Sequence, residues 1–304
     1  MSKYMKNSYI ITLSTAILLT MIGIWSFSGV TFAKSVWYKP VIHSDDDRIK
    51  VSVDKTNITK GSVTVTINSS NYNNGNNVVY YHEKDKKLFG PNAKIKITEN
   101  GYYEFPVSNV NGNYEYSPET VTADHWVTVE INNIDNKKPT VEYKGTYMTK
   151  NGYRFMDITF DDEMAIRRIK LPDGKYTYGD LDYQGTGIAP LIDVTRNGNY
   201  TFEAEDYAGN KITYTVKITD YKKASISVTS YKYKSKYVSG KTLPYAKVSV
   251  NDEFHIYGTG TANSKGIYKV RLKTLPKNGS TIYVWTNDKN KKYVTNYVKV
   301  KVKK

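Results

Sequence analysis

Residues 195–210 read TRNGNYTFEAEDYAGN, and this stretch decides the fold because it recurs 97 residues earlier as TENGYYEFPVSNVNGN at 98–113. The two segments align without a gap. They share seven identities: Thr98/Thr195, Asn100/Asn197, Gly101/Gly198, Tyr103/Tyr200, Phe105/Phe202, Gly112/Gly209 and Asn113/Asn210. A looser copy, SKGIYKV at 264–270, keeps a Gly, a Tyr and an apolar residue in register. The sequence therefore predicts three copies of one structural unit.

Each shared position has a physical role. Asn and Gly both tolerate positive φ, so the Asn-Gly pair is expected to turn the chain into a strand. Tyr and Phe lie two residues apart, so they face the same side of that strand, which we expect to be the buried side. The Gly-Asn pair seven residues after Phe is expected to make the next hairpin.

Period-2 alternation extends this pattern along the chain. It is clear at 49–53, 63–67, 127–131, 212–218 and 297–302, with Asn-Gly, Asp-Gly and Gly-Asn turn signals between such runs. The nearest approach to a helical period is 161–169, which is long enough for one helical turn. Many short strands predict an all-β fold of sandwiches or barrels.

Similar joints separate the copies. DNKKPTV at 135–141 precedes the second unit, and DYKKASI at 220–226 precedes the third. We predict a signal peptide at 1–33, an extended leader at 34–47, and three domains, called here module 1 (48–136), module 2 (137–221) and module 3 (222–304). The joints are short, so neighbouring modules should lie close together, and Pro139 should stiffen the first joint.

The N-terminus has the order of a secretory signal peptide. Lys3 and Lys6 are followed by an uncharged run from 7 to 33, and Thr31 and Ala33 offer the small residues that a signal peptidase needs. An uncleaved anchor helix is the alternative, since the run is long enough to span a bilayer. Both readings place the remainder of the chain outside the cell.

Composition narrows the class further. The sequence has no cysteine, so disulfides and lipidation of an N-terminal cysteine are excluded. The net charge is +15; residues 223–304 hold 18 Lys and Arg against 3 Asp and Glu, whereas residues 34–222 hold 24 against 26. Such an asymmetry bears on the partners of a protein rather than on its fold.

The motifs resemble a known family. The pattern T-x-N-G-x-Y-x-F-x-x-x-D-x-A-G-N at 195–210 and the joint at 135–141 resemble bacterial immunoglobulin-like (Ig-like) domains of Gram-positive cell surfaces. Module 3 is similar to a related type, with VSGKTLPYAKV at 238–248. The resemblance implies three tandem Ig-like β-sandwiches, which serve elsewhere as spacers, adhesins or accessory parts of enzymes. Module 1 departs from the pattern with Asn109 in place of Asp206, and module 3 has Asp288-Lys289-Asn290 in place of D-x-A-G-N.

Catalytic chemistry has little support in the sequence. His43, His82, His125 and His255 share no metal-ligand spacing, and no G-x-S-x-G elbow is present. We expect no enzymatic activity, no cofactor and no small-molecule substrate. Acidic residues cluster in module 2 at 161–163, 180–182 and 205–206. Calcium at Asp161 and Asp162 is the weaker alternative to solvated turn residues, with Asp206 capping its own hairpin.

The sharpest functional signal is the alternation of lysine with aromatic or apolar residues in module 3. If 231–237 (YKYKSKY) is a strand, its tyrosines face one way and its lysines the other, and KVKVKK at 299–304 repeats the pattern. Lysine on exposed strands also deters aggregation, but that role does not explain the imbalance of charge. We expect a polyanion to bind through these lysines: Lys232, Lys234, Lys236, Lys299, Lys301, Lys303 and Lys304.

Candidate polyanions are wall teichoic acid, anionic lipid headgroups, a host glycosaminoglycan and extracellular DNA. The sequence has no L-P-x-T-G sorting motif, so a basic module could hold the protein at a cell wall without a covalent bond. We therefore expect a monomeric, non-catalytic, extracellular protein, secreted or attached to the wall, with teichoic acid as the favoured partner. The alternatives are an adhesin or biofilm-matrix component and an accessory polysaccharide-binding protein.

Overall fold

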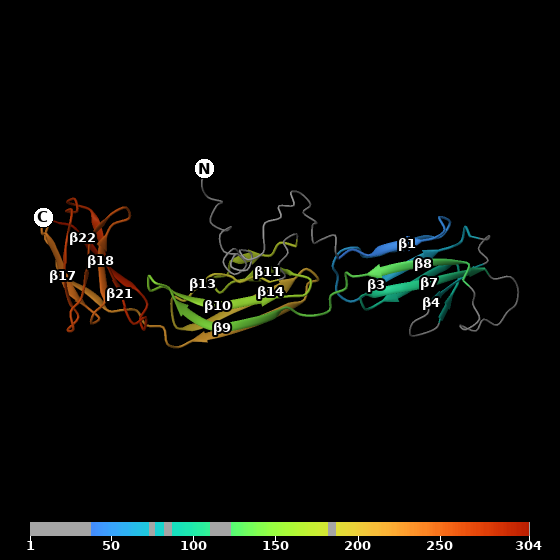
Figure 1. Cartoon of the computed structure of the whole chain (residues 1–304), viewed down its shortest axis with the longest axis horizontal. Coiled ribbons are helices and arrows are strands. Elements are labelled where there is room, and N and C mark those ends of the chain that lie inside the picture. The colour runs from blue at the N-terminus through green and yellow to red at the C-terminus, as the bar shows by residue number, and fades with distance from the viewer. Residues whose placement is uncertain (1–37, 73–76, 82–86, 110–122, 182–186, 304) are drawn as a thin grey trace, which may run out of the picture.

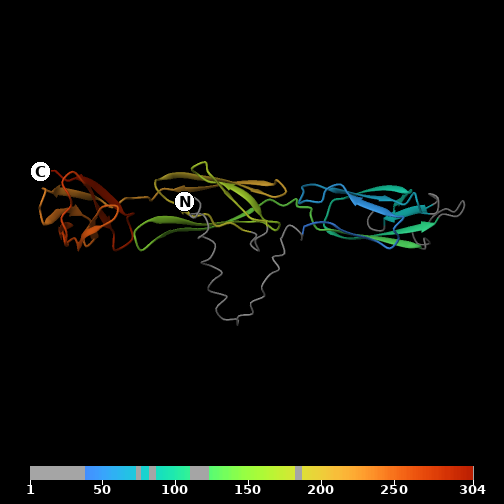
Figure 2. The ribbon, with the colours of Figure 1, turned by 90° about the horizontal axis from the view of Figure 1, so that it is seen from above.

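A computed structural model describes residues 38–72, 77–81, 87–109, 123–181 and 187–303. Helices are absent from these ranges, and the strands form six antiparallel sheets. The sheets pair into three Ig-like sandwiches that follow one another in a row (Figures 1 and 2). The predicted all-β fold of tandem Ig-like sandwiches is confirmed. The predicted signal peptide lies outside the described residues, and none of the described residues form a helix long and apolar enough to cross a membrane.

Module 1 packs a five-stranded sheet on a three-stranded one. The first has the order β1-β8-β7-β4-β5 and the second the order β2-β3-β6. The strands are β1 (Val41–Ser44), β2 (Lys50–Val53), β3 (Val63–Asn68), β4 (Asn77–Tyr81), β5 (Lys87–Phe89), β6 (Asn92–Ile97), β7 (Gly101–Asn109) and β8 (His125–Ile131).

Modules 2 and 3 each pair a three-stranded with a four-stranded sheet. Module 2 has the orders β13-β10-β9 and β12-β11-β14-β15, and module 3 has β16-β17-β20 and β19-β18-β21-β22. Module 2 contains β9 (Thr140–Met148), β10 (Arg154–Asp161), β11 (Ile166–Lys170), β12 (Tyr176–Tyr178), β13 (Ile192–Asp193), β14 (Gly198–Asp206) and β15 (Lys211–Ile218). Module 3 contains β16 (Ile226–Ser230), β17 (Tyr237–Thr242), β18 (Lys247–Asn251), β19 (Ile256–Thr261), β20 (Ile267–Arg271), β21 (Thr281–Asn287) and β22 (Asn296–Lys301).

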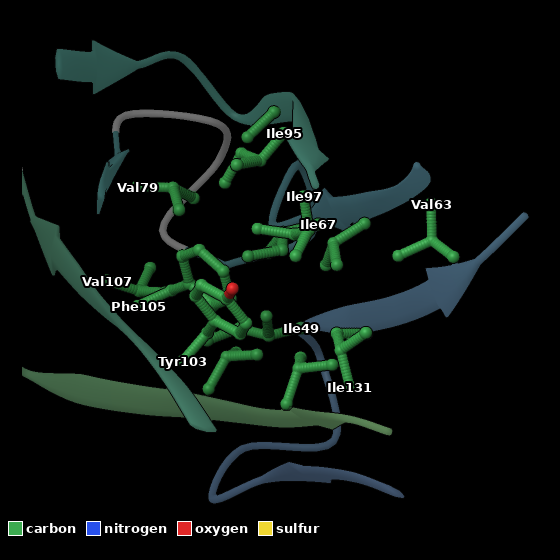
Figure 3. Packing of buried hydrophobic residues seen from close by; sticks show 14 of the residues in the cluster. Ile49, Val63, Ile67, Val79, Ile95, Ile97, Tyr103, Phe105, Val107 and Ile131 are labelled. Atoms are coloured by element: carbon green, nitrogen blue, oxygen red, sulfur yellow. The ribbon is translucent and has the colours of Figure 1, made fainter. Parts of the chain in front are cut away.

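The alternation in the sequence places every second side chain in a core. In β3, Val63, Val65 and Ile67 are fully buried between the two sheets, while the threonines between them lie on the outer side. Figure 3 shows Val63 and Ile67 in the core of module 1, into which Tyr103 and Phe105 of the opposite sheet also point. Burial of apolar surface on both inner faces is what holds each sandwich together without disulfides.

The repeated Tyr and Phe are buried, as predicted. Tyr103 and Phe105 are 6% and 0% exposed, and Tyr200 and Phe202 are 5% and 0% exposed. The Tyr103 hydroxyl donates to the Glu99 carbonyl at 2.7 Å, and the Tyr200 hydroxyl donates to the carbonyl four residues earlier at 3.0 Å. The ring therefore fills the core while its hydroxyl closes the turn that leads into the strand.

The repeated Asn acts differently from our prediction. Neither Asn100 nor Asn197 has positive φ, and of the two following glycines only Gly198 does, at +130°. Instead, each Asn side chain forms two hydrogen bonds with the backbone beyond the last strand of its module. Asn100 bonds the amide and carbonyl of Ile134, both at 2.8 Å, and Asn197 bonds those of Tyr221 at 2.8 and 3.3 Å. The side chain thus fastens the end of a module to the joint.

Two local expectations need correction. Residues 41–44, within the stretch expected to be an extended leader, form β1 and pair with β8. The carboxylate of Asp45 holds this end by accepting from the Trp126 amide at 3.0 Å. Residues 161–169 contain a turn and then β11 rather than a helical turn, because the Asp162 carboxylate accepts from the Met164 amide and β11 pairs with β14.

Candidate functional site

The predicted lysines lie along one edge of module 3 and at its far end. Residues 231–236 connect β16 to β17 as a turn with Lys234 at φ +64°, so the predicted strand at 231–237 is wrong except for Tyr237, which begins β17. Tyr231 and Tyr233 nevertheless pack against the core, and Lys232, Lys234 and Lys236 are exposed. The turn replaces a strand because the chain must cross from β16 to its antiparallel neighbour β17 at this point.

Edge strand β22 carries the other lysines, as the alternation predicted. Lys299 and Lys301 lie on its exposed side, while Val298 and Val300 face inward. The Lys303 carbonyl accepts from the Tyr233 amide at 3.2 Å, which joins the end of β22 to the turn at 231–236. We call the described members of this set the lysine strip: Lys232, Lys234, Lys236, Lys299, Lys301 and Lys303. Lys304 lies outside the described residues.

The described cations of module 3 have no carboxylate partners. Within the described residues 223–303, no Lys or Arg lies within 4.0 Å of an Asp or Glu oxygen. In module 2, by contrast, Arg168 pairs with Glu205 at 2.7 Å and Lys170 with Glu203 at 3.1 Å. The charge of module 3 is therefore available to an external anion.

Aromatic rings lie beside the lysine strip on the outer face of the same sheet. The Trp285 and Tyr297 ring centroids are 4.4 Å apart, and those of Tyr283 and Tyr297 are 5.6 Å apart. The Lys299 ammonium lies 5.7 Å from the centre of the Tyr283 ring. A shallow groove on this face is lined by Trp285 together with Lys247, Ser249, Thr259, Thr261 and Asn287. This aromatic face was not predicted from the sequence, although the alternation of β21 (TIYVWTN) indicates it.

The opposite sheet of module 3 is also basic. Lys241 on β17 and Lys269 and Arg271 on β20 are exposed there, and the Lys269 ammonium lies 4.6 Å from the centre of the Tyr237 ring. Positive charge therefore covers both faces. On the strip side, Lys299 adjoins the group of three rings formed by Tyr283, Tyr297 and Trp285.

The acidic residues of module 2 separate into two environments. Asp161 is exposed and does not join a cluster, whereas Asp162 lies with Asp135 and Asp206 in a buried group whose oxygens are within 4.8 Å of one another. Burial, with the nearby charges of Asp135 and Asp206, raises the pKa of Asp162 to about 7, and burial also raises the pKa of Asp135. The predicted pairing of Asp161 with Asp162 is thus replaced by a group drawn from three segments.

Asp206 also caps its hairpin, as predicted. Its Oδ1 accepts from the Asn210 amide at 2.8 Å, and Gly209 takes φ +88° in the same turn between β14 and β15. Sequence reasoning overlooked the approach of Asp135, whose signal was its place at the start of the joint. The Asn210 side-chain amide donates to the Asp135 carbonyl at 3.1 Å and brings the two segments together.

The histidines belong to separate surroundings. His125 lies against Asp45 and Asp46, at 3.2 and 3.3 Å, and His255 lies 3.4 Å from Asp252. His43 is on β1. His82 lies outside the described residues. Within the part of the chain that the structure describes, no group of three metal-ligating residues includes a histidine.

Comparison with known proteins finds a family model that matches module 3. A family model described as "Bacterial Ig domain" matches residues 224–303. No curated protein sequence matches the chain.

Similar solved structures have low identity to this chain. The apo structure of Bacteroides uniformis β-glucuronidase 3 shows 13% identity and a TM-score of 0.19 over 54% of this chain, which spans only 25% of that enzyme. The FN1–FN3 domains of chicken CNTN1 show 8% identity and a TM-score of 0.27, and the match covers 84% of this chain and 98% of that one. The BSP domain of a biofilm associated protein shows 9% identity and a TM-score of 0.23, and the match covers 88% of this chain and 67% of that one. At such TM-scores none of these similarities supports an inference about activity or ligands.

The match at 224–303 agrees with the motif VSGKTLPYAKV, whose Val238, Ala246 and Val248 are buried in the core of module 3. Gly240 of the same motif lies against Tyr268, where a Cβ atom would come within 2.6 Å of the tyrosine oxygen. The resemblance to bacterial Ig-like domains is therefore confirmed over residues 224–303, which match that family model.

Proposed function

We propose that this chain is an exported, non-catalytic protein whose module 3 binds an anionic cell-wall polymer, with wall teichoic acid as the favoured ligand. The observation that carries the proposal is the lysine strip, in which six exposed lysines have no carboxylate partner among the described residues. A flexible polyphosphate can follow such a strip, because Coulomb attraction and counterion release need no fixed ligand geometry. Modules 1 and 2 then act as a spacer or as a second binding surface.

Export is part of this proposal. It rests on the signal-peptide pattern of residues 1–33 and on the bacterial Ig domain at 224–303, a type of module usually found in extracellular proteins. A salt wash of the native cells tests it directly. A protein held by charge leaves the wall fraction at high salt, whereas one anchored in the membrane stays, and one found only in the cytoplasm contradicts export.

The ligand is tested with purified polymers at low salt. Teichoic acid, heparin and double-stranded DNA are compared in one binding assay with the purified protein, each at several salt concentrations. The proposal expects the tightest binding to teichoic acid and its loss near 1 M salt, where the Debye length is about 3 Å. Tighter binding to heparin or DNA would favour the adhesin or biofilm-matrix alternative, and binding that survives 1 M salt would contradict an electrostatic tether.

A second candidate function, binding of a polysaccharide, is favoured by the aromatic face of module 3. Sugar rings stack on aromatic side chains through their apolar faces, and the hydroxyl and amide groups of Ser249, Thr259 and Asn287 line the groove beside Trp285. This contact would resist salt. Replacement of Trp285 by Ala should then weaken binding to an uncharged wall polysaccharide and leave the salt-dependent binding to teichoic acid within about twofold, since Trp285 carries no charge.

A further inference from the structure

Three buried carboxylates converge where module 1 meets module 2. Asp135 belongs to the joint, Asp162 to the turn between β10 and β11, and Asp206 to the end of β14. Their exposures are 4%, 7% and 0%, and one oxygen from each lies within 4.8 Å of the others. Separate segments of the chain thus bring like charges together away from water, an arrangement that is unfavourable without a compensating group.

Oxygen atoms in this group lack partners. Each carboxylate uses Oδ1 to accept a nearby backbone N–H, from Lys137, Met164 and Asn210 respectively, at 2.8–3.0 Å. Oδ2 of Asp135 and Oδ2 of Asp206 are buried and accept no hydrogen bond. Oδ1 of Asn210, a side chain 2% exposed, is also buried without a partner, because its amide nitrogen is held by the Asp135 carbonyl. Buried polar atoms of native proteins rarely remain unsatisfied.

No cationic side chain neutralises the group among the described residues. Lys137, the nearest lysine in sequence, pairs instead with Glu163 at 2.6 Å on the surface. Arg167, Arg168 and Lys211 all pair with Glu205.

Related positions elsewhere in the chain are fully compensated. At the second joint, Asp220 aligns with Asp135 but lies 2.9 Å from the Arg154 guanidinium. In module 3, Asp288 stands at the place of Asp206, and both of its oxygens accept backbone N–H groups, from Asn290, Lys292 and Tyr293. Unlike Asp220 and Asp288, therefore, Asp135 and Asp206 each leave a buried carboxylate oxygen without a partner.

We propose that Asp135, Asp162 and Asp206 bind one Ca²⁺ ion between module 1 and module 2, with the side-chain carbonyl of Asn210 as a further ligand. Calcium–oxygen distances are about 2.4 Å, so two ligands of one ion lie at most about 4.8 Å apart. One oxygen from each of the three carboxylates lies within this limit of the other two. The proposed ligands are all hard oxygen atoms, three from carboxylates and one from a side-chain amide. Mg²⁺ suits them less, because it requires near-ideal octahedral geometry and retains several waters, and these side chains are almost completely buried.

The ion would connect two modules. One carboxylate comes from the joint, one from the turn after β10 and one from the end of β14, so Ca²⁺ would fix the joint against that end of module 2. This inference does not depend on the proposed function, since no residue of module 3 takes part.

Calorimetric titration of CaCl₂ into the EDTA-treated protein tests the site. We expect one ion per chain, and thermal unfolding should move to higher temperature in about 10 mM Ca²⁺, above the 10⁻⁴–10⁻³ M affinities of extracellular modules. Asp206→Asn should weaken Ca²⁺ binding at least about 100-fold, since loss even of groups that only support ligands costs 10–100-fold. Asp161→Asn, at the exposed neighbouring carboxylate, is the matched control and should bind as wild type.

Unfolding in EDTA separates a metal site from a merely structural cluster. Removing one carboxylate from this crowded, buried group should leave Asp206→Asn at least as stable as wild type in EDTA and less stable than wild type in Ca²⁺. Asp162→Asn serves as a second variant if the first does not fold. The proposal is overturned if wild type shows no heat of binding and the same unfolding temperature in EDTA and Ca²⁺, if Mg²⁺ binds as tightly, or if Asp161→Asn loses binding as Asp206→Asn does.

Discussion

Neutralising half of the lysine strip should halve the salt dependence of polyanion binding. The perturbation is K299Q/K301Q/K303Q, which leaves Lys232, Lys234 and Lys236 in place. Each cation that contacts a flexible polyanion contributes about −0.7 to the slope of log K against log salt, so six lysines predict a slope of about −4 and three predict about −2. A tenfold rise in salt should then cost wild type about 10⁴ in affinity and the variant about 10².

The matched control changes the same charge on the opposite sheet. K241Q/K269Q/R271Q also removes three exposed cations from module 3, but from β17 and β20. Binding of labelled teichoic acid is measured by fluorescence anisotropy over a salt series for wild type and both variants. The control should keep a slope near −4. Equal slopes for the two variants would refute the assignment to the strip, because the net charge of the module alone would then determine binding.

Three further predictions concern the joints and the cores. Gly152→Ala should loosen the contact of module 2 with module 3, because Gly152 has φ +80° and a Cβ there would lie 2.9 Å from Asn287 Oδ1, beside the Thr295–Gly152 hydrogen bond. Limited proteolysis at the second joint should then be faster than in wild type. Gly174→Ala is the control, since Gly174 has a similar φ but open space around it, and it should not have this effect. Asn197→Ala should cost about 1 kcal/mol in chemical denaturation, since two hydrogen bonds to Tyr221 are lost near the surface, while Asn199→Ala should be close to neutral. Burial raises the pKa of Tyr268 to about 12 from its ordinary value near 10. The free energy of unfolding should therefore be unchanged below pH 10 and fall by roughly 2–3 kcal/mol as the pH rises toward 12. Tyr268→Phe should remove this part of the decline, and a variant with the same pH profile as wild type would contradict the assignment.

The sequence predicted the strands because its side-chain period is short and local. A residue in a strand faces the opposite way from its neighbour whatever the strand pairs with. The alternation at 63–67 and 297–302 therefore correctly separated the inward-facing apolar residues from the outward-facing threonines and lysines. The repeat likewise identified Tyr103, Phe105, Tyr200 and Phe202 as core residues. The charge imbalance of module 3 was also readable, since it depends on composition alone.

The pairing between distant segments could not be predicted from the sequence, and only the tertiary structure decided it. The stretch 231–237 alternates like a strand, but most of it forms a turn because β16 and β17 are antiparallel neighbours joined there. Trp285 and Tyr297 meet only through the register of β21 with β22. Asp135, Asp162 and Asp206 are separated by up to 71 positions, and their approach depends on how the joint packs on the end of module 2. The physical reason is that alternation gives the side of a strand on which a residue lies, whereas the neighbour it meets there depends on long-range pairing that one sequence does not specify.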